Sequence, residues 1–197
     1  VAHDRKASVV LLEKSDRYGG SSAMSGGSLW VPQSHFMAEA GIADDREDAL
    51  AYLREITAGE VDAEKIEAYV DTAPEAVRYL AEHANLKMYS MPAYSDYYPR
   101  AKGSKPGGRS LDPETFDARS LGDDLLSMKD QNPQMLVMGR LFMTIPESRT
   151  MLTRAPGWIG LMMRLVVRYV LDLPWRFKSK RDRFLAMGNS LVGMLRQ

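Results

Sequence analysis

The sequence has no cysteine among its 197 residues and only three histidines, His3, His35 and His83. The missing cysteine excludes disulfide bonds, thiolate metal ligands and a cysteine nucleophile. The histidines lack the spacing of a zinc site, so we predict no bound metal. Because a chain without cysteine suits a reducing compartment, we expect a cytoplasmic protein.

An excess of charge of either sign is also missing. The chain has 26 basic and 26 acidic side chains, a formal net charge of zero and a pI near 7.0. This balance argues against binding to nucleic acid through a strongly basic surface, so no nucleic-acid partner is expected. Hydrophobic residues make up 45% of the chain, which is enough for a packed core. The length fits one domain, or one domain and a piece of another.

The sequence lacks an initiator methionine and a hydrophobic leader peptide. It begins Val-Ala-His-Asp-Arg-Lys and reaches its first apolar run after only seven residues. We therefore interpret the chain as an internal segment of a larger protein.

No apolar run is long and uninterrupted enough to span a membrane. The most apolar stretch, residues 158–173, contains Arg164, Arg168 and Asp172, whereas a spanning helix needs about 20 apolar residues. Residues 149–183 carry nine basic side chains and two acidic ones. A basic amphipathic helix can lie on an anionic membrane or meet a partner. We favour a packed helix with a solvated basic face and keep a peripheral membrane contact as the alternative.

The first regular element that the sequence predicts is a buried parallel strand over residues 8–13, which ends in Glu13. Its continuous, β-branched apolar run is typical of a strand that is covered on both faces. A glycine–serine segment (residues 19–27) follows. In dinucleotide-binding folds an acid at the end of the second strand binds the adenosine ribose, and glycines allow the backbone to approach a cofactor. A mobile loop after a strand is the alternative interpretation.

The rest of the chain is predicted to be mainly helical. Acidic N-caps, apolar residues at three- and four-residue spacing, and capping boxes at Thr72 and Thr144 mark the helix starts. We predict helices that begin near residues 45, 62, 73, 120, 145, 158 and 189, one or two short strands within 86–98, and a loop over 99–117.

Residues 13–32, EKSDRYGGSSAMSGGSLWVP, resemble the flavin-contacting segment of the fumarate reductase/succinate dehydrogenase flavoprotein superfamily. Within that superfamily the likeness is greatest to the 3-ketosteroid Δ1-dehydrogenase group. It continues through YSDYYP at residues 94–99, KPGGRS at 105–110 and MGNSLV at 187–192. The resemblance therefore covers almost the whole chain.

This resemblance implies an α/β two-domain FAD flavoprotein, with a Rossmann-like FAD domain and an inserted α+β substrate domain. The chain would be a mainly helical fragment of it. Residues 1–33 would belong to the FAD-binding domain, 34–185 to the substrate-binding and catalytic domain, and 186–197 to a helix that returns to the FAD domain. The GxGxxG phosphate motif that precedes the second strand in this family is absent.

The resemblance also implies which residues bind FAD. Glu13 would bind the adenosine ribose, and the other contacts would come from Lys14, Gly19, Gly20, Ser21, Ser22, Ala23, Ser25, Gly26 and Gly27.

The implied activity is desaturation of a ketone-bearing ring in a hydrophobic, steroid-like small molecule. Tyr97, or its neighbour Tyr98, matches the tyrosine that the substrate domain contributes as a base. His35 and Arg109 are left out of the predicted catalytic set. The alternatives are a related flavoprotein reductase or dehydrogenase, of the fumarate or Δ4-steroid type, and a non-enzymatic helical interaction module. The sequence does not indicate an oligomeric state.

Overall fold

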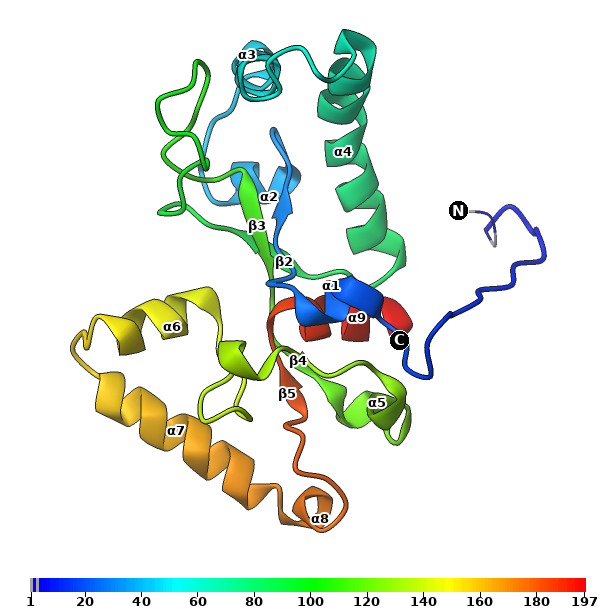
Figure 1. Cartoon of the computed structure of the whole chain (residues 1–197), viewed down its shortest axis with the longest axis vertical. Helices are drawn as coiled ribbons and strands as arrows, with labels where there is room; N and C mark the ends of the chain where they lie inside the picture. The colour runs from blue at the N-terminus through cyan, green and yellow to red at the C-terminus, as the bar shows by residue number, and fades with distance from the viewer. Residues whose placement is uncertain (1, 3) are drawn as a thin grey trace.

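The computed structural model describes residue 2 and residues 4–197, and its elements fall into two halves (Figure 1). Helices α1 (Gly20–Met24) and α9 (Met187–Arg196) lie between the halves. The upper half contains β1 (Leu29–Trp30), α2 (His35–Glu39), α3 (Arg46–Ile56), α4 (Ala63–His83), β2 (Met88–Ser90) and β3 (Ser110–Pro113). The lower half contains β4 (Phe116–Asp117), α5 (Asp124–Ser127), α6 (Ile145–Leu152), α7 (Trp158–Leu171), α8 (Leu173–Arg176) and β5 (Phe184–Leu185).

The upper half is built on a three-stranded antiparallel sheet in the order β1-β3-β2. Leu29 pairs with Leu111, and Leu111 also pairs with Ser90 on the other side. Leu111 is fully buried and shares a core with residues from α4 and β2. The sheet therefore joins the segment that follows the glycine–serine segment to residues about 80 positions further along the chain.

Helices α3 and α4 pack against each other through a small core of Ala49, Leu50, Ile66 and Val70. Helix α3 begins where the sequence predicts, because the Asp45 carboxylate accepts hydrogen bonds from two backbone N–H groups of the first turn.

The two helices predicted over residues 62–83 form a single helix, α4, with Pro74 inside it. The predicted capping box at Thr72 is therefore wrong. The Thr72 hydroxyl donates to the Ala68 carbonyl, 2.6 Å away, which is the hydrogen bond of a residue in a helix interior. Apolar packing of Ile66, Val70 and Val77 on one face keeps the helix continuous past the proline.

The lower half has its own core, into which α9 inserts Met187 and Met194. Strands β4 and β5 pair antiparallel, so the chain returns to the centre of the molecule just before α9 begins. The capping box at Thr144 and Glu147 is present and starts α6, as predicted. The long apolar helix α7 is also present at the predicted place.

Two other predictions about secondary structure are wrong. Residues 8–13 are extended but pair with no strand in the described part of the chain, and their apolar side chains are exposed, Leu11 by 94%. A strand of this composition is stable only between neighbouring strands, which these residues do not have here. The predicted loop over 99–117 contains β3 and β4. Its glycines and prolines, which are uncommon inside strands, favoured the prediction of a loop although two short strands form there.

Among the residues that the structure describes, no helix is both long enough and apolar enough to cross a membrane.

Candidate functional site

The glycine–serine segment begins with a helix rather than with an open loop. Residues 20–24 form α1, which packs along α9 in the centre of the molecule (Figure 1). Gly19, the N-cap of α1, and Gly20, its first residue, have φ angles of +107° and +53°, a region that glycine enters without steric cost.

Close contact between the glycine–serine segment and α9 depends on two glycines. A Cβ atom added to Gly27 would lie 2.6 Å from the carbonyl carbon of Met187. A Cβ atom on Gly188 would lie 1.9 Å from the carbonyl oxygen of Ser22. Both distances are far below van der Waals contact, so these glycines allow one backbone to rest on the other.

Hydrogen bonds from two buried side chains fix the inner side of the segment. Asn189 Nδ2 donates to the Ala23 carbonyl at 2.6 Å, and Gln131 Nε2 donates to the Ser25 carbonyl at 3.0 Å. The Gly188 N–H also donates to Ser25, at 3.1 Å. Sequence reasoning missed Gln131 and Asn189, although Asn189 lies within the MGNSLV motif.

The outer side of the segment is open. Gly20, Ser21, Ser22 and Ser25 are exposed, whereas Ala23 and Gly27 are buried. Apart from its chain neighbours and the backbone of its own helix, no described part of the chain lies within 4 Å of the position that a Cβ on Gly20 would occupy. An exposed glycine with a positive φ angle, followed by two exposed serines, fits the close approach of a polar cofactor such as FAD. The inner contacts hold this surface in place.

Glu13 and Lys14 lie outside the packed body of the molecule. Both are exposed at the end of the unpaired segment 8–13, and Glu13 Oε1 accepts a hydrogen bond from the Ser15 N–H at 2.9 Å. Their predicted contacts with FAD stay a prediction.

The predicted catalytic pair borders a hollow of about 520 Å³. This volume is within the roughly 300–1,000 Å³ of small-molecule sites. Tyr97 is 77% exposed and Tyr98 is 61% exposed. The hollow is lined by Glu55, Ile56, Tyr97, Tyr98, Pro99, Arg100 and Ala101.

A third tyrosine lies against the pair. The rings of Tyr94 and Tyr97 meet edge to face, with centroids 6.2 Å apart. The hydrogen bond with Tyr97 is the main cause that raises the pKa of the Tyr94 phenol. Tyr94 and Tyr97 therefore form an interacting pair of phenols beside the hollow.

A buried ion cluster lies directly beneath the tyrosine loop. Arg109 is fully buried and pairs with two buried carboxylates, Asp44 at 2.8 Å and Asp96 at 3.0 Å. Arg109 is one of the two residues left out of the predicted catalytic set. The structure shows that both carboxylates bound by this guanidinium belong to the protein itself.

The structure does not bring the tyrosine pair against α1. The loop between β2 and β3, which carries the pair, lies at the outer end of the upper half, while α1 lies at the centre (Figure 1).

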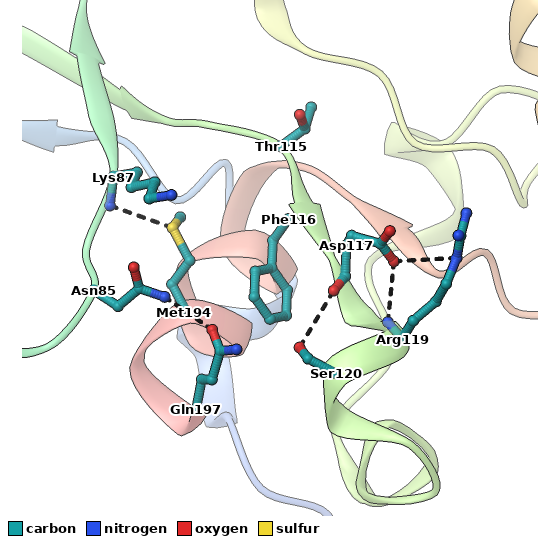
Figure 2. Close-up of a pocket in the computed structure, with 9 residues that line it drawn as sticks. All are labelled: Asn85, Lys87, Thr115, Phe116, Asp117, Arg119, Ser120, Met194 and Gln197. Atoms are coloured by element: carbon teal, nitrogen blue, oxygen red, sulfur yellow. Dashed lines mark hydrogen bonds and ion pairs between the residues drawn. The ribbon is translucent and has the colours of Figure 1, made fainter.

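A separate hollow of about 460 Å³ lies beside the C-terminal part of α9 and contains none of the predicted site residues (Figure 2). Its polar groups largely satisfy one another: Asn85 Nδ2 donates to Gln197 at 2.8 Å, and the Lys87 N–H donates to the Met194 sulfur at 3.3 Å. We assign no role to this hollow.

Comparisons with known proteins agree with the resemblance found in the sequence. The 3-oxosteroid 1-dehydrogenase of Comamonas testosteroni is 35% identical over 195 residues, which are 98% of this chain and 34% of that protein. The 3-oxosteroid 1-dehydrogenase of Mycobacterium tuberculosis H37Rv is 36% identical over 200 residues, which are 100% of this chain and 34% of that protein. The chain thus spans about a third of the length of these curated relatives.

A solved structure agrees with the fold. The crystal structure of 3-ketosteroid Δ1-dehydrogenase from Sterolibacterium denitrificans, in complex with 1,4-androstadiene-3,17-dione, matches 99% of this chain and 34% of that chain. The TM-score is 0.91 and the sequence identity 41%. The family model described as an FAD binding domain matches residues 1–189. The chain therefore belongs to the FAD-binding domain family, whose cofactor is FAD.

Proposed function

We propose that the protein carrying this chain is an FAD-dependent dehydrogenase that desaturates a ketone-bearing ring of a steroid-like substrate. The observation that carries the proposal is the match to a steroid-complexed ketosteroid dehydrogenase over 99% of the chain, with 41% identity. The hollow beside Tyr97 and Tyr98 supports it, because five of its seven lining residues are aromatic or aliphatic, and the other two, Glu55 and Arg100, are charged. Fumarate-type and Δ4-steroid activities are not favoured.

Desaturation removes a proton from the carbon next to the ketone and two electrons with the hydrogen of the adjacent carbon, so that a C=C bond forms. Bound FAD supplies the two-electron acceptor. We assign the proton to Tyr97 Oη, because this hydroxyl is exposed at the hollow and interacts with the Tyr94 phenol. Tyr98, which lines the same hollow, is the second candidate.

We further propose the two-domain arrangement for the whole protein. Residues 1–33 would form part of the FAD domain, 34–185 the substrate domain and 186–197 a returning helix. The packing of α1 on α9 supports this division, because it brings residues 20–24 of the first part against residues 187–196 of the last part. The open surface around Gly20 and the serines supports placing FAD on the outer side of α1.

The test is to make Tyr97→Phe and Tyr98→Phe separately in the FAD-loaded protein that carries this chain. With a 3-ketosteroid added, reduction of bound flavin in a single turnover should be slower by about 10²–10⁴-fold in the variant that lacks the base. FAD content should not change, because neither hydroxyl holds the fold. Unaltered flavin reduction in both variants would reject the tyrosine base, and lack of reduction of the parent protein by any 3-ketosteroid would reject the activity.

We also propose a peripheral contact between α7 and an anionic membrane. Ile159, Met163, Val167 and Val170 form an exposed apolar stripe along one face of this helix. Phe177, 92% exposed, continues the apolar surface just past α8. Exposed basic side chains flank the stripe: Arg149, Arg154, Arg164, Lys178 and Lys180. Apolar insertion with basic flanks is the pattern of helices that lie in a lipid interface.

Co-sedimentation with phosphatidylglycerol vesicles tests the membrane proposal. The full protein should bind these vesicles and not phosphatidylcholine vesicles, and the double variant Val167→Asp/Phe177→Asp should lose binding. The control is the double variant Val61→Asp/Leu126→Asp, which places the same two charges at exposed apolar residues outside α7. Equal sedimentation of the double variant and the control would contradict the proposal. The cytoplasmic location stays a prediction.

A further inference from the structure

We propose that Trp30 and Tyr52 are positioning residues for the Tyr97–Tyr98 pair, and that Trp30 acts through Asp96. This inference rests on the proposed function, because it assumes that one of the two tyrosines receives the substrate proton. It identifies side chains that touch neither substrate nor cofactor and yet hold the loop on which the base is carried.

Asp96 is the residue before Tyr97, and every oxygen of its carboxylate is bonded. Oδ1 accepts the indole N–H of Trp30 at 2.7 Å. Oδ2 accepts the backbone N–H of Lys105 at 2.8 Å and Nη1 of Arg109 at 3.0 Å. Asp96 is only 3% exposed. Because neighbouring Cα atoms are fixed about 3.8 Å apart, anchoring Asp96 limits where Tyr97 can lie.

The anchor of Asp96 is itself rigid. Arg109 grips Asp44 with two nitrogens, at 2.8 and 2.9 Å, and also donates to the Gly103 carbonyl at 2.9 Å. This bidentate grip fixes the guanidinium plane. The guanidinium lies 5.4 Å from the centre of the Trp30 ring, within the range of a cation–π contact.

Tyr52 holds the pair from the other side. Its hydroxyl oxygen accepts the backbone N–H of Tyr98 at 3.3 Å, and its ring stacks on Trp30 with centroids 5.6 Å apart. Tyr52 is 3% exposed. The side chains of Tyr97 and Tyr98 are thus exposed, while their backbone is held by the contacts of Asp96 on one side and by the hydrogen bond from the Tyr98 N–H on the other.

Trp30 also connects this anchor to the glycine–serine segment. It lies in β1, three residues after Gly27, whose backbone rests on α9. The Trp30–Asp96 hydrogen bond therefore links the glycine–serine segment, which we assign to FAD, with Asp96. Asp96 is the residue before Tyr97, the assigned base. A dehydrogenase needs these two parts at a fixed separation, because misplacement of about 1 Å can slow a reaction about 10²-fold.

The experiment uses the FAD-loaded protein that carries this chain, a 3-ketosteroid and single-turnover reduction of the flavin. Trp30→Phe removes the indole N–H and keeps an aromatic ring, whereas Asp96 or Arg109 variants would leave a buried charge without its partner. We expect flavin reduction to slow by about 10- to 100-fold, with little change in substrate KM or FAD content. Tyr52→Phe, which removes only a hydroxyl, should slow the same step.

Tyr69→Phe is the matched control. The Tyr69 hydroxyl donates to the Trp30 carbonyl and its ring also stacks on Trp30, but it has no contact with Asp96 in the structure. This variant therefore loses a hydrogen bond to Trp30 without disturbing the link to the tyrosine loop, and it should reduce flavin at nearly the parent rate.

Double variants separate positioning from general stability. If Trp30 acts through the base, adding Trp30→Phe to the damaging tyrosine variant should cause no further loss of rate. Additive losses of rate in the double variant would overturn the inference. So would flavin reduction in Trp30→Phe and Tyr52→Phe that is as fast as in Tyr69→Phe. Either result would leave the assignment of the tyrosine base intact. Failure of the proposed function gives other patterns: if no tyrosine is the base, Tyr97→Phe and Tyr98→Phe both reduce flavin normally, and if the activity is wrong, no 3-ketosteroid reduces the flavin of the parent protein.

Discussion

Single glycines in the glycine–serine segment serve different purposes that the sequence does not distinguish. Gly27 and Gly20 both have positive φ angles, of +76° and +53°. Gly27 is pressed against the backbone of α9, whereas the space in front of Gly20 is open. Gly27 is therefore needed for packing, and Gly20 is free to face a ligand.

This contrast predicts opposite phenotypes for two alanine variants. Gly27→Ala should lower the free energy of unfolding of the apoprotein by about 2–4 kcal/mol, from a steric clash added to an unfavourable φ. Gly20→Ala should cost about 1 kcal/mol, from φ alone, and should retain less FAD than the parent protein. Urea unfolding and the flavin absorbance of purified protein measure the two effects. Equal losses of stability in both variants would contradict the assignment.

At the scale of helices and strands, α4 is less stable than its length suggests. Pro74 lies within this helix and has no N–H to donate to the carbonyl four residues earlier. Pro74→Ala restores that donor, so we expect the free energy of unfolding to rise by about 1–3 kcal/mol. Glu75→Ala, at the next and exposed position, is the control and should change stability by less than about 0.5 kcal/mol. Thermal unfolding with no gain for Pro74→Ala would show that α4 already tolerates the proline.

Elements with local signals were predictable from the sequence, and those that depend on distant partners were not. The Asp45 cap and the Thr144 capping box specify helix starts within a few residues, and both are present. The strand over 8–13 was wrong because pairing requires neighbours that sequence patterns cannot supply. Strand β3 was missed because its pairing with β1 joins distant segments.

The candidate site shows the same division. The glycine–serine segment and the tyrosine pair carry recognisable motifs. The groups that hold them do not, since Asp44, Asp96 and Arg109 converge only when the chain has folded. Gln131 and Asn189 likewise contact the glycine–serine segment from more than 100 residues away.

For the whole molecule, α9 is the element on which both halves depend. Met194 is buried in the lower core, and Leu191, one turn earlier, packs against the upper core. Because the two cores share this helix, the halves should unfold together.

Met194→Ala should therefore destabilise the entire chain by about 2–5 kcal/mol, which is the usual cost of truncating a buried methionine. A single transition should persist in urea, followed by near-ultraviolet and far-ultraviolet circular dichroism. The control is Leu195→Ala, because Leu195 is the adjacent residue of α9 but is 47% exposed. Two separated transitions, with only the lower half weakened, would contradict the coupling of the halves.

The exposed run Val9–Leu12 has a consequence for the behaviour of the chain in solution. Four consecutive exposed apolar residues whose backbone pairs with no strand among the described residues are a template for intermolecular β-pairing and aggregation. Charged neighbours flank the run, with Arg5 and Lys6 before it and Glu13 and Lys14 after it. Such flanking charges act as gatekeepers that oppose stacking of identical strands. Colloidal stability should therefore depend on salt, because screening these charges removes the main barrier to self-association.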